Sequence, residues 1–177
     1  MTKKKKITKL QAISVKNIIE AVQKVNSLTS LEMNQLSLQL MKNQSPLCKS
    51  ITEFSLDDLT LEQSEHVWYL LFVCYYACDG EKLPTLTVEK DIPEAFRVVE
   101  KLAHHSMDEK EKKVFEKAFL SFPEAPLFAY VVGYLERQGI TSKTESKSAR
   151  QILLICYALV QLFHLARKKR LRLRVGE

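Results

Sequence analysis

Cysteine and histidine side chains are the residues of this chain that could build a metal site. Cys74 and Cys78 stand four residues apart in an apolar run, so a helix there places both thiols on one face. With Cys156 and either His104 or His66, they would complete a tetrahedral zinc site. Cysteines in apolar runs, however, usually pack as small hydrophobic side chains. We therefore predict that Cys74 and Cys78 are core residues and that the chain holds no metal.

A basic run near the end of the sequence is the second chemical feature. It contains six cations: Arg167, Lys168, Lys169, Arg170, Arg172 and Arg174. Such side chains bind phosphate oxygens, so these six are the candidate contacts for a nucleic-acid backbone or an anionic membrane surface. The same residues also suit the end of a long helix, because cations complement the negative end of the helix dipole. No aromatic residues are interleaved, which predicts backbone contact without sequence preference.

The excess positive charge lies at the two ends of the chain. Five lysines stand in the first nine residues, and the basic run lies in the last eleven. Residues 10–166 hold 16 Lys and Arg against 20 Asp and Glu, so this body has a formal charge of −4 while the whole chain has +6. We predict a basic N-terminal tail over 1–9, an all-helical domain over 10–166 and a basic C-terminal tail over 167–177.

The usual signatures of catalytic and nucleotide-binding sites do not occur in the sequence. The four glycines stand too far apart to form a phosphate-binding loop. No Glu is followed three residues later by His, as di-iron bundles require, and there is no HExxH motif. The pair His104 and His105 stands near the end of an amphipathic segment, where an imidazolium complements the helix dipole, and we favour that role over catalysis. We predict that the protein is not an enzyme and uses no cofactor.

Helix signals recur along the whole chain, whereas strand signals are rare. Four helix starts are marked by capping-box patterns: Thr29–Glu32, Thr60–Gln63, Ser106–Glu109 and Ser142–Glu145. We expect helices near 10–25, 29–41, 61–79, 91–103, 106–122, 126–138 and 143–170, with short helical or irregular structure over 47–59. The alternation of Leu36, Leu38 and Leu40 leaves a short strand as the alternative for 29–41.

Composition and pattern together define the expected fold class. Apolar residues at 46% and charged residues at 27% are typical of a soluble globular protein, and 177 residues suffice for one core. Segments 61–79, 126–138 and 149–166 are apolar nearly all round, so we expect them to form the buried centre. The fold class is therefore all-α: a single-domain orthogonal helical array or bundle of about seven to eight helices, with short basic N- and C-terminal tails.

Two apolar runs raise the question of a membrane segment. Residues 67–78 and 152–166 are twelve and fifteen residues long, shorter than the 18 or more that span a bilayer. Polar residues interrupt the segment that follows the first lysines, so we expect no secretory signal. We predict no transmembrane span, reduced cysteines and a cytoplasmic protein. A C-terminal anchor flanked by the basic run is the membrane alternative.

A binding role fits these observations better than a reaction does. We predict a non-catalytic helical adaptor or accessory subunit that binds protein partners within a larger assembly. The alternative is a nucleic-acid-associated protein that contacts phosphates through its basic termini. Weak nucleic-acid or anionic-membrane contact through the tails is compatible with both. Salt separates the two hypotheses, because phosphate binding weakens steeply as salt rises.

Overall fold

A computed structural model describes residues 10–56, 59–103, 122, 124–141 and 146–175. These residues form seven α-helices and one short 3₁₀ helix, with no strand among them, which confirms the all-α class. The predicted N-terminal tail, His104 and His105, and nearly all of the predicted helix over 106–122 lie outside the described residues. So does the capping box predicted at Ser142–Glu145.

Most helix boundaries follow the local signals closely, but the first helix begins at Val15, five residues after the start expected near residue 10. In chain order the elements are α1 (Val15–Ser27), α2 (Ser30–Asn43), α3 (Ser45–Leu56), α4 (Leu61–Ala77), η1 (Gly80–Lys82), α5 (Asp91–Ala103), α7 (Ala125–Arg137) and α8 (Lys147–Val175). The capping boxes of α2 and α4 are both formed, with the hydroxyls of Thr29 and Thr60 accepting hydrogen bonds from the backbone. The strand alternative for 29–41 is wrong, because the capped helix α2 runs through all of the alternating leucines.

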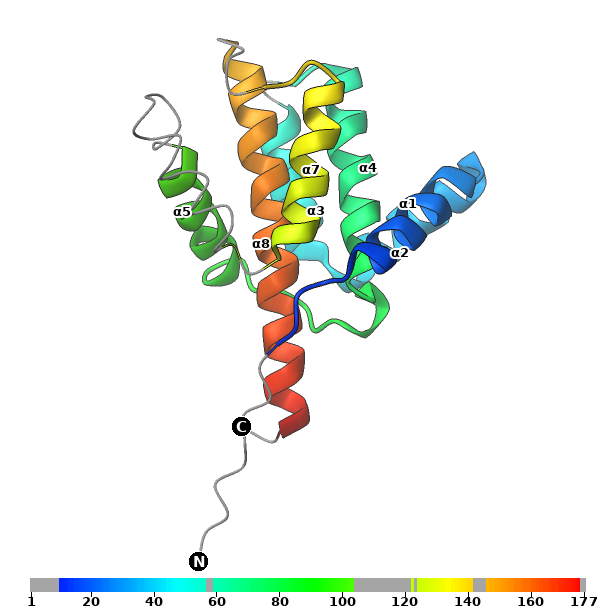
Figure 1. The fold of residues 1–177 in the computed structure, drawn as a ribbon, viewed down its shortest axis with the longest axis vertical. Helices are drawn as coiled ribbons and strands as arrows, with labels where there is room; N and C mark the ends of the chain where they lie inside the picture. Colours follow the sequence, from blue (N-terminus) through cyan, green and yellow to red (C-terminus); the bar gives the residue numbers. More distant parts are fainter. Residues whose placement is uncertain (1–9, 57–58, 104–121, 123, 142–145, 176–177) are drawn as a thin grey trace, which may run out of the picture.

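The long helix α8 forms the centre of the structure (Figure 1). Helices α4, α5 and α7 pack against it, and α1 packs against α4. All of residues 152–163 are buried except Leu154, and α4 is buried without interruption over 70–75. The prediction that these two helices form the buried centre is confirmed. Helix α7 keeps a partly open outer face, where Ala129 is exposed and Tyr130 and Tyr134 are half-buried.

A tight turn ends α4 and aims one carboxylate at α8. Asp79 adopts a left-handed conformation with φ of 57°, which Asp tolerates better than most residues. The next residue must be glycine, because a Cβ on Gly80 would lie 2.1 Å from the buried ring of Tyr75. As a result the chain reverses sharply, and the Asp79 side chain comes within reach of Arg170 on α8.

Helix α8 is also long and apolar enough, by length and composition, to cross a membrane. Among the described residues it is the one helix of this kind, with an 18-residue window of mean hydropathy 1.5 inside Lys147–Arg174. Within the protein, 67% of that window is buried, as in the core helix of a soluble fold. The absence of a transmembrane span therefore stays a prediction.

Helix α2 is enclosed by the rest of the protein on one side only. Helix α1 lies against α4 through Ile18, Ala21 and Val25 and projects away from the α4–α7–α8 layer (Figure 1). Helix α2 packs against α3 and buries only Leu36 and Leu40. Most of its circumference is therefore available to solvent.

Candidate functional site

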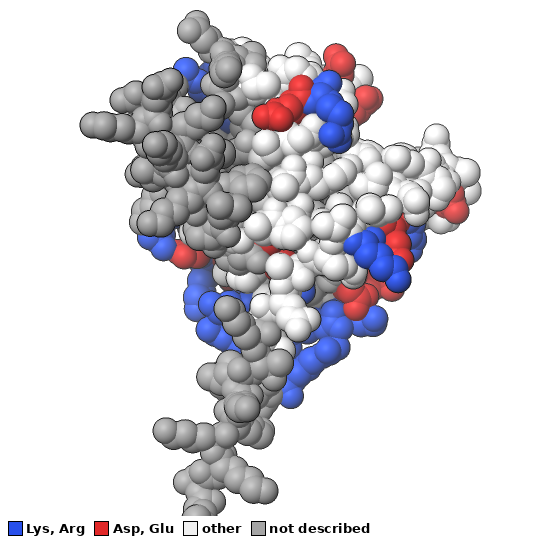
Figure 2. Space-filling view, viewed as in Figure 1, with Lys and Arg blue, Asp and Glu red and all other residues white. Residues whose placement is uncertain are grey.

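All six residues of the predicted basic run lie on α8, which continues to Val175. Lys and Arg side chains gather around the end of this helix in Figure 2. The six residues fall into two sets of three. The inner cations are partly buried: Arg167, Lys169 and Arg170. The outer cations are exposed: Lys168, Arg172 and Arg174.

The inner cation Arg167 pairs with the most deeply buried carboxylate described. Glu124 precedes α7 and is fully buried. One of its oxygens accepts a hydrogen bond from the Arg167 guanidinium and lies 3.2 Å from Nδ1 of His164, and the other accepts one from the backbone N–H of Ile13 at 2.8 Å. Arg167 also donates to the carbonyl of Gln11 at 2.9 Å. This cluster fastens the N-terminal segment and the start of α7 to α8.

The inner cation Lys169 pairs with a second buried carboxylate, Asp91, the first residue of α5. Asp91 also accepts hydrogen bonds from the backbone and the hydroxyl of Thr87. Burial alone would raise the pKa of Asp91, but the hydrogen bonds from Lys169 and Thr87 outweigh it, so the pKa lies below its usual value. The ionised carboxylate also complements the positive end of the α5 dipole.

The third inner cation, Arg170, donates to Asp79 at 3.2 Å in a more open setting. Hydrogen bonds from Lys82, at 2.9 and 3.1 Å, lower the pKa of Asp79 most; burial opposes them, and the hydrogen bond from Arg170 lowers the pKa further by a smaller amount. Each inner cation is therefore neutralised by a carboxylate of another segment. Together they join α8 to the end of α4 and to the starts of α5 and α7.

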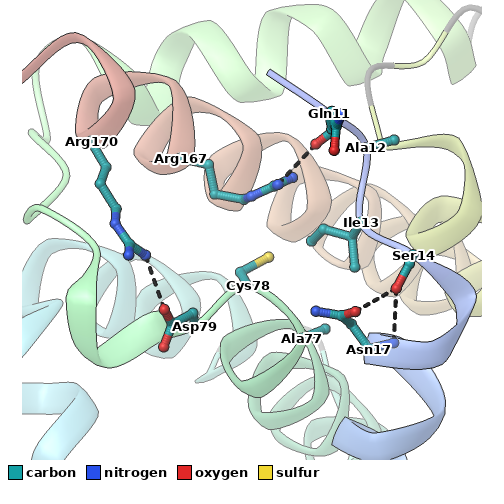
Figure 3. A pocket seen from close by; sticks show the side chains of 10 residues that line it. All are labelled: Gln11, Ala12, Ile13, Ser14, Asn17, Ala77, Cys78, Asp79, Arg167 and Arg170. Carbon is teal, nitrogen blue, oxygen red and sulfur yellow. Dashed lines mark hydrogen bonds and ion pairs between the residues drawn. The ribbon is translucent and has the colours of Figure 1, made fainter. Parts of the chain in front are cut away.

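A shallow open pocket of about 420 Å³ lies beside two of these pairs (Figure 3). The residues that line it come from the N-terminal segment, the first turn of α1, the end of α4 and the side of α8. In Figure 3, Arg167 reaches toward Gln11 and Arg170 toward Asp79, and the Cys78 thiol lies between them. Both guanidinium groups already have hydrogen-bond partners, so their positive charge is largely balanced and the pocket is not strongly cationic.

Cys78 and the other three cysteines are buried and unpaired. Burial raises the pKa of Cys48 to about 11 and that of Cys74 to about 12, and it also raises the pKa of Cys78 and Cys156. The thiols are therefore protonated at neutral pH, and a protonated buried thiol is a poor nucleophile and a poor metal ligand.

The metal arrangement considered from the sequence loses His66 as a ligand. Nδ1 of His66 lies 2.9 Å from the hydroxyl of Tyr134, and His66 precedes Cys74 by eight residues, about 12 Å along the helix. No group of three or more His, Cys, Asp or Glu side chains suited to a metal ion occurs among the described residues. His104, the other ligand considered, lies outside those residues.

An aromatic cluster joins α4 to α7, and the sequence patterns did not reveal it. The Tyr69 ring stacks on Tyr134 with centroids 4.8 Å apart, and its hydroxyl lies 3.2 Å from that of Tyr130. Burial raises the pKa of Tyr134 to about 12 and also raises that of Tyr130. Spacings of three and four residues place His66 beside Tyr69 and Tyr130 beside Tyr134, but only the helix packing brings the two pairs together.

The three carboxylates that bind the inner cations were not identified from the sequence either. A weak signal existed, because each stands at a predicted helix boundary: Asp79 at a stop, Asp91 at a start and Glu124 between two prolines. Nothing in that pattern tells which basic residue each one meets. Their partners are 43 to 91 residues away along the chain.

The outer cations are the part of the basic run that a phosphate or an anionic surface can reach. Lys168, Arg172 and Arg174 form no ion pair with another described residue. With three phosphate contacts, the logarithm of the binding constant should fall with the logarithm of the salt concentration with a slope near −2.7. Binding would then weaken about 40-fold between 50 and 200 mM salt, whereas six contacts would weaken it about a thousand-fold. At about 1 kcal/mol per basic residue the outer cations would contribute about 3 kcal/mol on an anionic membrane.

Comparison of the chain with protein-family models, with curated proteins and with solved structures finds no match.

Proposed function

We propose that this protein is a non-catalytic helical adaptor or accessory subunit that binds protein partners within a larger assembly. The observation that carries the proposal is where large apolar side chains are exposed. Of eight such residues in the described part of the chain, five lie on α1 and α2: Val15, Ile19, Leu31, Leu38 and Met41. Clustered exposed apolar side chains are typical of protein interaction surfaces, whereas scattered ones are ordinary.

The apolar side chains of α1 and α2 form two separate faces. On α1, Val15 and Ile19 are one helical turn apart and both more than half exposed. On α2, the exposed residues are Leu31, Leu38 and Met41. In Figure 2 this part of the molecule shows uncharged surface with charged side chains along its edge, and on α1 the exposed pair Lys16–Glu20 stands next to Val15 and Ile19. On α2 the only charged residues are Glu32 and Lys42, and a helix face with few charges suits burial against a protein better than contact with phosphates.

The chemistry of the described side chains supports a binding role. All four thiols are buried and have raised pKa values, and the inner cations are held by carboxylates. None of these groups is prepared to attack a substrate or to transfer a proton at neutral pH. Buried thiols without disulfide bonds are compatible with a reducing compartment, and we propose a cytoplasmic location.

The second candidate function is nucleic-acid association, and the outer cations are the observation that favours it. Lys168, Arg172 and Arg174 are exposed on the last turns of α8. They are too few for tight binding at physiological salt, so this contact would be weak and independent of sequence.

Affinity capture from the native cell tests the proposed function. Tagged full-length protein is incubated with lysate at 50 and 200 mM salt, with nuclease added, and bound proteins are identified by mass spectrometry. We expect a set of protein partners that survives both treatments. The double variant Val15→Asp/Ile19→Asp should no longer capture the protein partners that bind Val15 and Ile19 on α1.

Two control variants make the capture experiment specific. Leu61→Asp changes another highly exposed apolar residue, outside α1 and α2, and should retain the same partners. Lys168→Gln/Arg172→Gln/Arg174→Gln should also retain them. If every partner disappears with nuclease or with the triple Gln variant, the adaptor proposal is wrong and nucleic-acid association replaces it.

A further inference from the structure

The exposed face of α2 has the spacing of a coiled-coil seam. Leu31, Asn34, Leu38 and Met41 follow one another at intervals of three, four and three residues. This is the pattern of the two seam positions in a heptad repeat, over two heptads. All four side chains are exposed, with Leu31 and Leu38 each at 67% and Met41 at 46%. This exposed face therefore has the side-chain pattern that one helix of a coiled coil presents to a second helix.

The seam is separate from the face that α2 uses within its own chain. Leu36 and Leu40 are the buried residues of the helix, and they lie roughly opposite the seam at 100° per residue. Pairing through the seam therefore leaves the contact with α3 unchanged. No unfolding or rearrangement is needed to expose it.

The four positions are symmetric about residue 36, so the seam is complementary to itself when a second copy runs antiparallel. In that arrangement Leu31 of one copy meets Met41 of the second copy, and Asn34 meets Leu38. Antiparallel helix pairs form such layers between the two different seam positions, and a twofold axis repeats every contact once.

The charges on α2 favour the same direction. Glu32 and Lys42 lie at opposite ends of the helix, and they are its only charged residues. Glu32 lies about 140° from the centre of the seam and is held by Thr29 in the capping box, whereas Lys42 lies beside the seam. An antiparallel pair keeps the two Lys42 side chains at opposite ends, and it also aligns opposite ends of the helix dipoles. A parallel pair would place the two Lys42 side chains together at one end.

We propose that α2 pairs antiparallel with α2 of a second copy of this chain through Leu31, Asn34, Leu38 and Met41. The contact contains only three large apolar residues from each copy, so the dimer is weak and forms at about micromolar to submillimolar concentration. Asn34 reduces the affinity and helps to fix the register. The inference deepens the proposed function, on which it rests for protein binding through this part of the molecule, and leaves the α1 face free for other partners.

Sedimentation equilibrium of the full chain between about 1 and 300 μM tests self-association. We expect monomer at the low end and dimer at the high end. Leu38→Glu places a charge in both central layers and should raise the dissociation constant at least tenfold, whereas Leu61→Glu, a matched exposed leucine on α4, should not change it. Circular dichroism should show equal helix content in all three proteins. A chain that stays monomeric at 300 μM overturns the proposal.

Disulfide cross-linking tests the register. In the double variant Leu31→Cys/Met41→Cys, mild oxidation should give a covalent dimer, because each new thiol faces the other type in the second copy. Either single variant should give little covalent dimer, because the same residue in the two copies is about 15 Å apart along the helices. The natural cysteines are buried and should not contribute. Equal cross-linking of Leu31→Cys alone would overturn the antiparallel pairing.

Failure of this inference and failure of the proposed function give different results. A strictly monomeric chain that still captures other proteins through Val15 and Ile19 overturns the dimer and leaves the adaptor function in place. A chain that dimerises through α2 but captures no other protein retains the dimer and overturns the adaptor function.

Discussion

The inner and outer cations of α8 are alike in residue type, stand within eight residues of one another and have different roles. Arg167, Lys169 and Arg170 are partly buried and each is bound by a carboxylate from another segment. Lys168, Arg172 and Arg174 point to solvent. The six cations of the basic run therefore do not form one continuous exposed surface. Half of the run holds the fold together, and only the other half is available to a partner.

Helix geometry explains how neighbouring residues divide in this way. Lys168 and Arg172 stand four residues apart and share the face of α8 that points away from the carboxylates. Arg174 returns to the side of Arg167 but lies two turns further on, and it is exposed there. The inner cations occur where α4, α5 and α7 surround the helix, and because burial is costly for an unpaired charge, each has a partner there.

The largest difference between the two sets is expected at Arg167. Arg167→Ala removes the guanidinium that binds the buried carboxylate of Glu124, so the variant should lose about 3 kcal/mol of unfolding free energy. Arg172→Ala is the matched control and should change it by less than about 0.5 kcal/mol. Urea denaturation followed by circular dichroism measures both. Equal stability of the two variants would mean that Arg167 and Arg172 do not differ in role.

A smaller effect is expected at Lys169. Lys169→Ala removes the charge partner of Asp91, but the backbone and hydroxyl of Thr87 still donate to that carboxylate. The free energy of unfolding should therefore fall by about 2 kcal/mol at pH 7.

The pH dependence of the Lys169→Ala effect provides an independent check. The pKa of folded Asp91 is lowered, so its stabilisation is present above the unfolded pKa of about 4 and is lost as pH falls through the folded pKa. The difference in stability between wild type and Lys169→Ala should therefore shrink in acid. A difference that is constant from pH 7 to pH 2.5 would contradict the pairing.

Among the inner cations, Arg170 should matter least. Its partner Asp79 is 51% exposed and keeps two hydrogen bonds from Lys82 when Arg170 is removed. Solvent screening reduces the stabilisation from such a pair, so Arg170→Ala should lower the free energy of unfolding by about 0.5 kcal/mol, measured in the same urea experiment. A loss above about 2 kcal/mol would place Arg170 with Arg167 as a structural residue.

Local signals in the sequence predicted the helices well because they act over short distances. The capping boxes at Thr29 and Thr60 and the start at Asp91 each depend on residues within one turn, and all three are confirmed. The end of α8 was harder, because cations stabilise the end of a helix without showing where it stops. The structure extends that helix from the expected Arg170 to Val175.

The candidate site could be predicted only in part. Composition identified the six cations, but the choice between inner and outer depends on carboxylates that approach from three other segments. The contact between Arg167 and Glu124 spans 43 residues and that between Arg170 and Asp79 spans 91. Such pairings are set by tertiary packing, and neither periodicity nor charge counting encodes them.

The last prediction concerns the outer cations, where we expect almost no effect on stability and a clear effect on weak phosphate binding. Lys168→Gln/Arg172→Gln/Arg174→Gln should unfold within about 0.5 kcal/mol of wild type, because no described carboxylate depends on these residues. Wild type should bind duplex DNA without sequence preference. The variant should lose the part of the salt slope that three contacts contribute, about 40-fold in affinity between 50 and 200 mM salt, while the lysines of residues 1–9 are the same in both proteins. Fluorescence anisotropy with a labelled duplex measures both. If Arg170→Gln also lowers the salt slope, the inner cations leave their carboxylates to bind phosphate, and the division of the basic run would then hold only for the free protein.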